Sequence, residues 1–300
     1  MLTHYPHYKF YLFICLIINV SIFCNNQYIS KWGDVIIKNN SIGVTDTEII
    51  DAIDNHIFYI NSKFGEIIQD TFSVIISNKN SKLYNNNNWN WSLGITRNNT
   101  IIIKSPSKAN ITKTRFLQVL RHELNHLYLN RLHPSLNIPR WFSEGFAMHY
   151  ANENYLSNKI LIAKNINNKE LFNIDFLDSK FYSSSKNSFD FAYAYSQILV
   201  SKLIHEYSEE LLLKILIELR DGSDFDQVFY NNIMLTVSDY NKIIFNQVNS
   251  KFWWLSFIKI PSLLLVLAPL LLIISFILIK IRNKRVIKEW ELEEKFENEK

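Results

Sequence analysis

The sequence predicts an α+β fold in which a small β-sheet lobe is followed by a helical lobe and a C-terminal transmembrane helix. Three observations support this prediction. Short runs rich in β-branched residues occupy the first third of the chain, apolar residues recur at helical spacing from Thr112 onward, and Ile260–Ile279 contains no charged residue. Because 48% of the residues are hydrophobic and 14% are aromatic, the chain can build a packed core.

The β-rich lobe is predicted over residues 27–110. Strands are expected at Asp34–Lys38, Thr71–Ser77 and Thr100–Lys104. Between the first two strands, Thr45 or Asp46 caps a helix that runs to about Phe64, with isoleucines at helical spacing. Asn85–Asn90 is an Asn-rich loop, and a short turn leads from there toward the third strand.

The helical lobe is predicted over residues 111–250. Its main helices are expected at Thr112–Leu132, Pro139–Glu153, Ser188–Ser208 and Ser208–Arg220. The two cysteines of the chain, Cys15 and Cys24, lie before both lobes. We therefore expect neither a disulfide nor a thiolate metal site in the folded region, and any metal there must be held by His and carboxylate side chains.

The N-terminal segment, residues 1–26, is predicted to be a signal peptide or an N-terminal anchor. A weakly basic start is followed by an apolar run from Phe10 to Phe23, without a clean cleavage site after it. Cys24 is either a lipidated residue or an incidental cysteine, and the preceding Phe23 fits lipidation poorly.

Residues 251–281 are predicted to form a transmembrane helix, because Ile260–Ile279 is about long enough to cross a bilayer. Trp253 and Trp254 precede this run and several basic residues follow it. The positive-inside rule then places the charged tail, residues 282–300, in the cytoplasm and the folded region outside it. The net charge of +4 comes with no basic stripe on the folded region, so nucleic acid is not an expected partner.

A metal-binding pattern, H-E-x-x-H, is formed by His122-Glu-Leu-Asn-His126. On a helix, positions i and i+4 lie one turn apart on one face, so both imidazoles can reach one ion. Glu123 lies at the edge of that face, where it can reach a water molecule without binding the ion. The opposite face carries Leu117, Leu120, Leu124 and Leu127. One side of this helix is therefore expected to be core and the other a site, although a surface pair or core histidines would show the same spacing.

A second helix is expected to begin at Pro139 and to carry Glu144, in the run Pro139-Arg-Trp-Phe-Ser-Glu-Gly-Phe-Ala147. A helix–loop–helix with Trp-x-x-Glu-Gly-x-Ala resembles the gluzincin metallopeptidases. It is most similar to the peptidase MA-like domain, a relative of the thermolysin and membrane alanyl aminopeptidase groups, and the resemblance is strongest from about Thr100 to Ala151. This resemblance implies that Glu144 is the third ligand, that Zn²⁺ is the cofactor and that the fourth position is left to water.

The same resemblance implies roles for other residues. Glu123 is the expected general base, which takes a proton from a zinc-activated water and passes it to the leaving amine. Tyr193 aligns with a tyrosine that stabilises the tetrahedral intermediate, and Tyr195 is the alternative donor, although aromatic residues on a helix are often core. His133 and His149 are expected to do no chemistry.

Two departures from the family pattern limit what can be carried over, and the place of one strand stays open. Thermolysin has an Asp four residues after the ligand Glu, where this chain has Met148, so the partners that orient the His ligands are unassigned. Gly94-Ile-Thr-Arg-Asn98 is not the acidic motif with which aminopeptidases bind the substrate amine, and exopeptidase specificity is not inferred. The strand Thr100–Lys104 is either an edge strand that could pair with an extended peptide or an interior strand.

The main hypothesis is a membrane-anchored zinc metallopeptidase that hydrolyses peptides or proteins outside the cytoplasm. The alternative is a catalytically degenerate peptidase-like domain, a membrane-anchored adaptor that binds peptides or proteins. An intramembrane protease is disfavoured, because Arg121, Asn125 and Arg131 flank the ligands and require water.

Overall fold

The computed structural model describes residues 26–30, 33–39, 43–65, 71–77, 92–132, 138–153, 155–183, 185–252 and 260–298. Its strands are β1 (Asn26–Ser30), β2 (Gly33–Asn39), β3 (Phe72–Ser77), β4 (Gly94–Arg97) and β5 (Thr100–Lys104). Its helices up to residue 109 are α2 (Asp46–Phe64) and α3 (Pro106–Ala109). The later ones are α4 (Lys113–Leu132), α5 (Arg140–Tyr150), α6 (Tyr155–Lys164), η2 (Lys169–Phe172), α7 (Ile174–Lys180), α8 (Lys186–Tyr207), α9 (Glu209–Arg220), α10 (Phe225–Ile233), α11 (Val237–Phe252) and α12 (Ile260–Asn298).

The described strands form one sheet in the order β1-β2-β3-β5-β4. The inner strands β2, β3 and β5 run parallel, and β1 and β4 are added antiparallel at the two ends. Alternate residues of β3, such as Phe72 and Val74, are buried. They pack in one core with Ile49 and Ile53 of α2 and with Leu120 of α4, so α4 is held rigidly against the sheet.

The first predicted helix is confirmed, and its start has a local cause. Thr45 Oγ1 accepts a hydrogen bond from Glu48 N, and a Glu48 carboxylate oxygen accepts one from Thr45 N. This capping box satisfies backbone N–H groups that the first turn of a helix leaves unpaired. The three predicted strands and the four main predicted helices are also present, within a few residues of the expected bounds.

The position of the predicted strand Thr100–Lys104 is decided by the sheet order. As β5 it lies between β3 and β4, so it is an interior strand, with Ile101, Ile102 and Ile103 buried. The edge of the sheet next to β5 is formed by β4, a strand that the sequence pattern did not predict. It is short and antiparallel to β5, and the turn at Asn98, which has a positive φ of 51°, joins the two strands.

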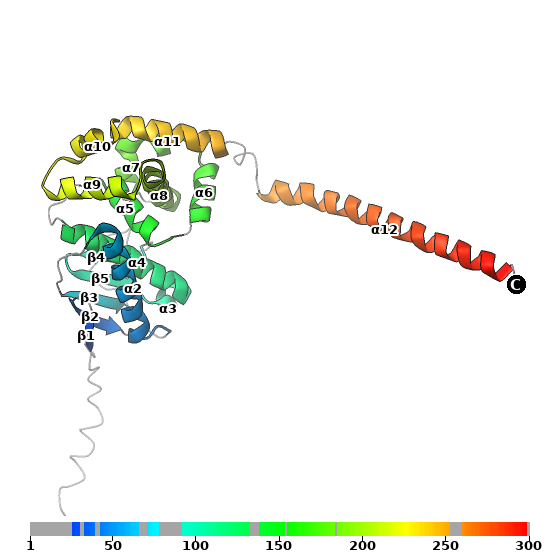
Figure 1. Ribbon diagram of the computed structural model, residues 1–300, viewed down its shortest axis with the longest axis horizontal. Coiled ribbons are helices and arrows are strands. Elements are labelled where there is room, and N and C mark those ends of the chain that lie inside the picture. Colours follow the sequence, from blue (N-terminus) through cyan, green and yellow to red (C-terminus); the bar gives the residue numbers. More distant parts are fainter. Residues whose placement is uncertain are drawn as a thin grey trace, which may run out of the picture.

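The helices from α5 to α11 contribute to one core with α8, which lies at the centre of the upper part of the body in Figure 1. Gly145 of α5 allows α8 to approach closely: a Cβ on Gly145 would lie 2.3 Å from the carbonyl oxygen of Ser196. A glycine inside a helix is unfavourable by itself, and here it is explained by this backbone contact. The contact fixes the orientation of α5 and of the side chains that α5 presents to α4.

The predicted transmembrane helix at Ile260–Ile279 is a wrong prediction. Among the residues described, none of the helices combines the length and the apolar character needed to cross a membrane. The predicted placement of the folded region outside the cytoplasm and of the tail inside it depended on this span and is withdrawn with it.

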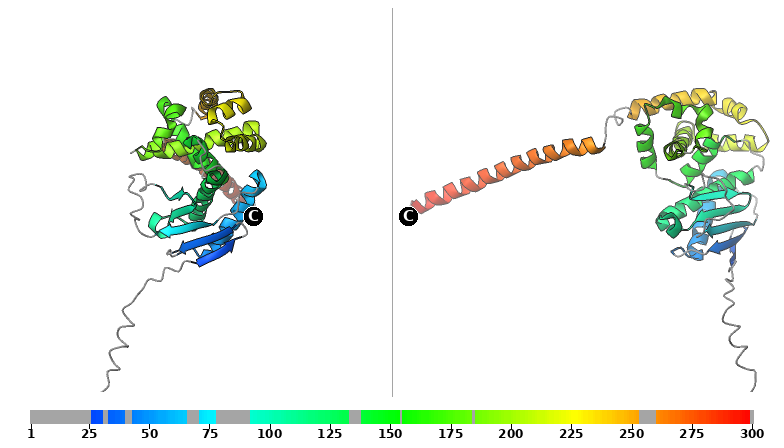
Figure 2. Two further views of the ribbon diagram at one scale, coloured as in Figure 1. Left: turned by 90° about the vertical axis from the view of Figure 1, so that its left-hand side faces the viewer. Right: turned by 180° about the vertical axis from the view of Figure 1, so that it is seen from behind.

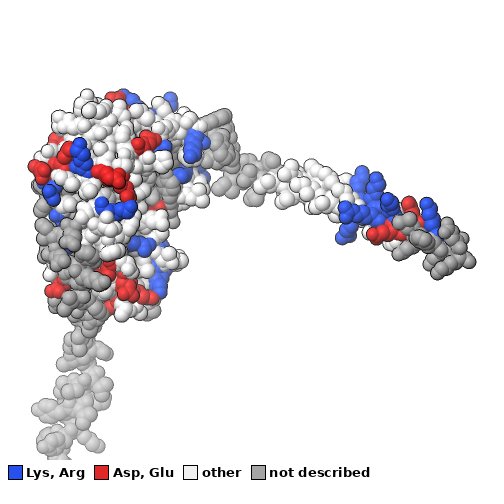
Figure 3. Space-filling view, in the orientation of Figure 1, with Lys and Arg blue, Asp and Glu red and all other residues white. Residues whose placement is uncertain are grey.

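Figures 1 and 2 show α12 as a single helix that leaves the body, and Figure 3 shows Lys and Arg side chains gathered on its C-terminal half. Several predictions fall outside the described residues. These are the signal peptide or anchor with Cys24, the loop Asn85–Asn90, the pair Trp253 and Trp254, and His133.

Candidate metal centre

The two histidines of the motif project from α4 toward α5, as predicted from their spacing. Their Nε2 atoms lie 3.0 Å apart, and the two rings meet edge to face at a centroid distance of 4.8 Å. His122 is buried and His126 is half-buried. The opposite side of α4, with Leu120, Leu124 and Leu127, lies in the sheet core, so packing fixes the direction in which the imidazoles point.

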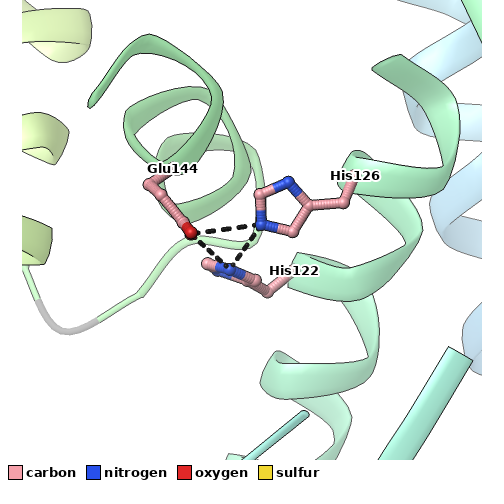
Figure 4. Close-up of side chains that lie close together, drawn as sticks. All are labelled: His122, His126 and Glu144. Carbon is pink, nitrogen blue, oxygen red and sulfur yellow. Dashed lines mark hydrogen bonds and ion pairs between the residues drawn. The ribbon is translucent and has the colours of Figure 1, made fainter. Parts of the chain in front are cut away.

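Glu144 reaches the same point from α5. Its Oε2 atom lies 3.1 Å from His126 Nε2 and 3.3 Å from His122 Nε2. Figure 4 shows these three side chains converging from two helices. Among the described residues, this trio is the group of three or more His, Cys, Asp or Glu side chains that could hold a metal ion.

The donor set fits a zinc ion. In a tetrahedral site with bonds of about 2.0–2.1 Å, ligand atoms are separated by roughly 3.3 Å. The three separations seen here, 3.0, 3.1 and 3.3 Å, are close to that value. Two imidazoles and one carboxylate supply three ligands, which leaves one coordination position for a catalytic zinc site to use.

Glu123 lies beside the trio without belonging to it. It is buried, and Thr96 Oγ1 of β4 donates a hydrogen bond of 2.7 Å to its Oε2 atom and approaches its main-chain oxygen at 2.9 Å. Gly94 lies against the same carboxylate, because a Cβ there would lie only 2.7 Å from Glu123 Oε1. Burial raises the pKa of Glu123, and the neighbouring His122 and His126 only partly oppose this shift.

The sequence comparison with families agrees with this geometry, since residues 56–248 match the Peptidase MA superfamily. The chain belongs to this superfamily. Its peptidase-like domain therefore carries the H-E-x-x-H helix and the glutamate helix in the arrangement just described. No curated protein matches the sequence.

Solved structures of M1 zinc metallopeptidases are similar to this Peptidase MA member at low identity. One from Deinococcus radiodurans is 11% identical with a TM-score of 0.40, and the match covers 73% of this chain and 50% of that one. A mutant from the same organism bound to a Tyr-Ser-Ala substrate is 11% identical, with a TM-score of 0.40 and coverage of 72% and 48%. A two-domain mutant bound to L-tryptophan is 10% identical, with a TM-score of 0.41 and coverage of 71% and 48%. This chain spans about half the length of these proteins.

The partner that orients His122 in this Peptidase MA member is Glu153, which the sequence pattern did not identify. Glu153 Oε1 lies 2.8 Å from His122 Nδ1, and its Oε2 lies 2.7 Å from Arg115 Nη2. Glu153 follows the end of α5, where Asn152 adopts a positive φ of 54° and turns the chain back toward α4. Glu153 is therefore the carboxylate partner of His122, whereas Met148 is buried.

His126 has a weaker partner, since its Nδ1 lies 3.2 Å from Ser143 Oγ on α5.

The charge of Glu144 is balanced by several groups. Burial alone would raise the pKa of Glu144, but His126 and His122 hold it well below the usual range. Arg140 Nε donates a hydrogen bond of 3.2 Å to Glu144 Oε1 from one turn earlier on α5.

Arg140 is a second residue that sequence reasoning missed. Its guanidinium lies over the rings of Phe181 and Tyr182, at 4.7 and 4.8 Å from their centroids. These stacked contacts hold the side chain against Glu144. The signal in the sequence was the position of Arg140 four residues before Glu144, a spacing that allows an ion pair on a helix.

The two candidate tyrosines of α8 lie in different surroundings. Tyr193 lies at the metal centre, where its hydroxyl donates a hydrogen bond of 3.3 Å to Glu144 Oε1. Tyr195 is fully buried and donates instead to Asn241 Oδ1, so it is a core residue. His149 is also outside the metal centre, where its Nδ1 pairs with Ser201 Oγ at 2.9 Å.

Proposed function

We propose that this protein hydrolyses peptide bonds with a zinc ion held by His122, His126 and Glu144. The observation that carries the proposal is the convergence of three ligand atoms within 3.3 Å of one another beside a buried glutamate that is not a ligand. When bound, zinc would polarise the scissile carbonyl and acidify a water molecule.

Glu123 is the proposed general base. Its carboxylate accepts a proton from the attacking water and later delivers that proton to the leaving amine. Burial raises its pKa, which brings the carboxylate closer to the pH at which a base both accepts and releases protons efficiently. Thr96 and Gly94 of β4 restrict where this carboxylate can point.

Tyr193 is the proposed donor to the oxygen of the substrate carbonyl as negative charge develops on it. Burial and the nearby Glu144 raise the pKa of Tyr193 well above its usual value, so the hydroxyl keeps its proton at neutral pH. Arg140 is a positioning residue in this proposal, because it holds the distal oxygen of Glu144 and leaves Oε2 directed at the histidines.

The substrate proposed for this site is an extended peptide. β4 is an edge strand of the described sheet. It lies next to α4, where Thr96 of β4 contacts Glu123. An extended peptide that pairs with the outer edge of β4 would run past the general base, and main-chain hydrogen bonds would bind it with little dependence on sequence.

The test is hydrolysis of denatured protein substrates by the full chain, together with its zinc content. We expect about one zinc ion per chain, activity that a chelator removes and zinc restores, and a loss of roughly 100-fold or more in Glu123→Gln. Glu218→Gln, a change of the same type at a half-buried glutamate of α9 that lies outside the candidate site, serves as the control. Unchanged hydrolysis in Glu123→Gln contradicts the proposal, and metal-independent peptide binding without turnover would favour the adaptor function instead.

A further inference from the structure

The helix that carries Glu144 begins without a side-chain cap from its own sequence. Pro139 precedes α5 and offers no capping hydrogen bond from its side chain. The first N–H groups of a helix have no partner inside that helix, so they must be satisfied from outside. At α5 the acceptor comes from another helix, because Asp178 of α7 accepts hydrogen bonds from Arg140 N at 3.3 Å and from Trp141 N at 3.2 Å. The start of α5 is therefore held by α7.

A carboxylate suits this position for two reasons. Each of its oxygens accepts from a different one of two successive N–H groups, which fixes both the place and the direction of the helix start. Its negative charge also lies at the positive end of the α5 dipole. Asp178 is half-buried, so water competes with these hydrogen bonds less than it would at an exposed cap. Since Glu144 lies only one turn after Arg140, fixing this start also fixes the proposed ligand.

The chain that directly follows this carboxylate contacts the same flank of the metal centre. Phe181 is fully buried, and its ring meets the ring of Tyr193 edge to face at a centroid distance of 5.1 Å. The guanidinium of Arg140 lies over the rings of both Phe181 and Tyr182. The 178–182 segment therefore contacts the start of α5, the arginine beside the proposed glutamate ligand and the proposed donor to the substrate oxygen.

We infer that Asp178 is a positioning residue of the metal centre, because it joins the start of α5 to the 178–182 segment. Its hydrogen bonds among the described residues go to main-chain N–H groups alone, so it acts on Glu144 only through the helix. It acts on Tyr193 through the ring of Phe181. The inference rests on the proposed zinc site and adds to that site α7, which lies outside both motif helices.

The test compares Asp178→Ala with the wild type, each as the full chain. Zinc affinity, measured by competition with a chelator, should fall by about 10-fold, the lower end of what an outer partner of a metal ligand contributes. The visible absorption bands of bound Co²⁺ should shift, because their energies depend on the geometry of the ligands. At saturating zinc, kcat should fall several-fold, because the hydroxyl of Tyr193 is no longer held in place.

Three further variants separate positioning from stability. Asp178→Asn keeps one oxygen as an acceptor and should restore part of the zinc affinity and part of the Co²⁺ spectrum. Asp175→Ala removes an exposed carboxylate from the same helix and should leave both unchanged. Ile37→Val, a core change in β2 on the far side of the sheet lobe from α5, lowers the stability to a degree similar to the loss of a cap and should leave zinc affinity unchanged.

Wild-type zinc affinity and an unchanged Co²⁺ spectrum in Asp178→Ala overturn the inference. An equal loss of affinity in Ile37→Val also overturns it, because the effect would then follow stability alone. If Asp178→Ala does not fold, Asp178→Asn is compared with the wild type instead and should show a smaller loss of the same kind. A wild-type chain that binds neither Zn²⁺ nor Co²⁺ gives a different result, since it overturns the proposed zinc site itself and this inference with it.

Discussion

On the α5 flank of the metal centre, Glu144 meets His122, His126, Arg140 and Tyr193, whereas on the β4 flank Glu123 meets the hydroxyl of Thr96. Both glutamates are buried to a similar degree, with 6% and 4% of their surface exposed. Their pKa values nevertheless shift in opposite directions. Burial raises the pKa of Glu123, while at Glu144 the same penalty is outweighed by the histidines.

The difference teaches that partners, rather than depth, set the opposite pKa shifts of these two carboxylates. Glu144 is kept anionic and directed at the imidazoles, as the proposed metal ligand must be. Glu123 has no cation within direct hydrogen-bond contact among the described residues and is held by β4, so it remains available to exchange a proton. Substitutions on either flank test this comparison, because those on the α5 flank should change zinc binding and those on the β4 flank should change kcat.

Glu144→Gln should have the largest effect, because it removes the negative charge that joins α5 to the two histidines. We expect zinc affinity to fall by roughly 100-fold or more, beyond the loss typical of an outer partner, and hydrolysis to be lost with it. Zinc titration with a competing chelator checks this. Retained zinc with normal activity would show that Glu144 is not a ligand.

Gly94→Ala should act on the other flank alone. The added Cβ would lie 2.7 Å from Glu123 Oε1 and 2.9 Å from its Cγ, so the general base must move. We expect kcat to fall by roughly 100-fold while zinc content stays at the wild-type value. The measurement is steady-state kinetics on a peptide substrate with zinc analysis in parallel, and a loss of zinc would contradict the separation of the two flanks.

Glu153→Ala should produce a smaller effect on the metal. It removes the carboxylate 2.8 Å from His122 Nδ1, and an outer partner of this kind typically contributes 10–100-fold in metal affinity. At saturating zinc, kcat should change little. Arg115→Gln is the graded control, because Arg115 pairs with Glu153 rather than with His122 itself and should give a weaker loss of the same sign.

His56→Gln should have the smallest effect at neutral pH and tests the scaffold of α4. His56 Nε2 lies 2.8 Å from Asn125 Oδ1, and Asn125 donates to the carbonyl of Ala147 on α5. Burial lowers the pKa of His56 from 6.5 to about 4. Because the folded-state pKa is the lower one, the unfolded chain binds more protons between these values, and His56 destabilises the fold as the pH falls from about 6.5 to about 4.

The expected loss in the free energy of unfolding is on the order of 3 kcal/mol across that range, and it should be absent in His56→Gln. Denaturant unfolding at a series of pH values measures it. Parallel curves for the wild type and the variant would show that His56 is not responsible.

Much of the fold could be predicted from local patterns. The capping box at Thr45, the isoleucine spacing of α2 and the leucine face of α4 act over a few residues, so the sequence indicates them directly. The sheet order could not be obtained this way, because the parallel pairings of β3 with β2 and with β5 join strands that are distant in the sequence, and β4 rather than β5 forms the edge of the sheet. The transmembrane prediction rested on the apolar run alone, and it was wrong, because no helix among the described residues is long and apolar enough to cross a membrane.

At the candidate site, the sequence by itself determined the residues whose relation is local: His122 and His126 one turn apart, with Glu123 between them. It also identified Glu144 and Tyr193 through family resemblance. Only the tertiary structure decided that Glu153 and Thr96 support them, because these contacts join a turn and a strand to α4 and depend on the path of the whole chain. Arg140 lies one turn before Glu144 on the same helix, but its contacts with Phe181 and Tyr182 are likewise tertiary. Helical spacing is encoded within one element, whereas the neighbours of a buried carboxylate are decided only when the separate elements pack together.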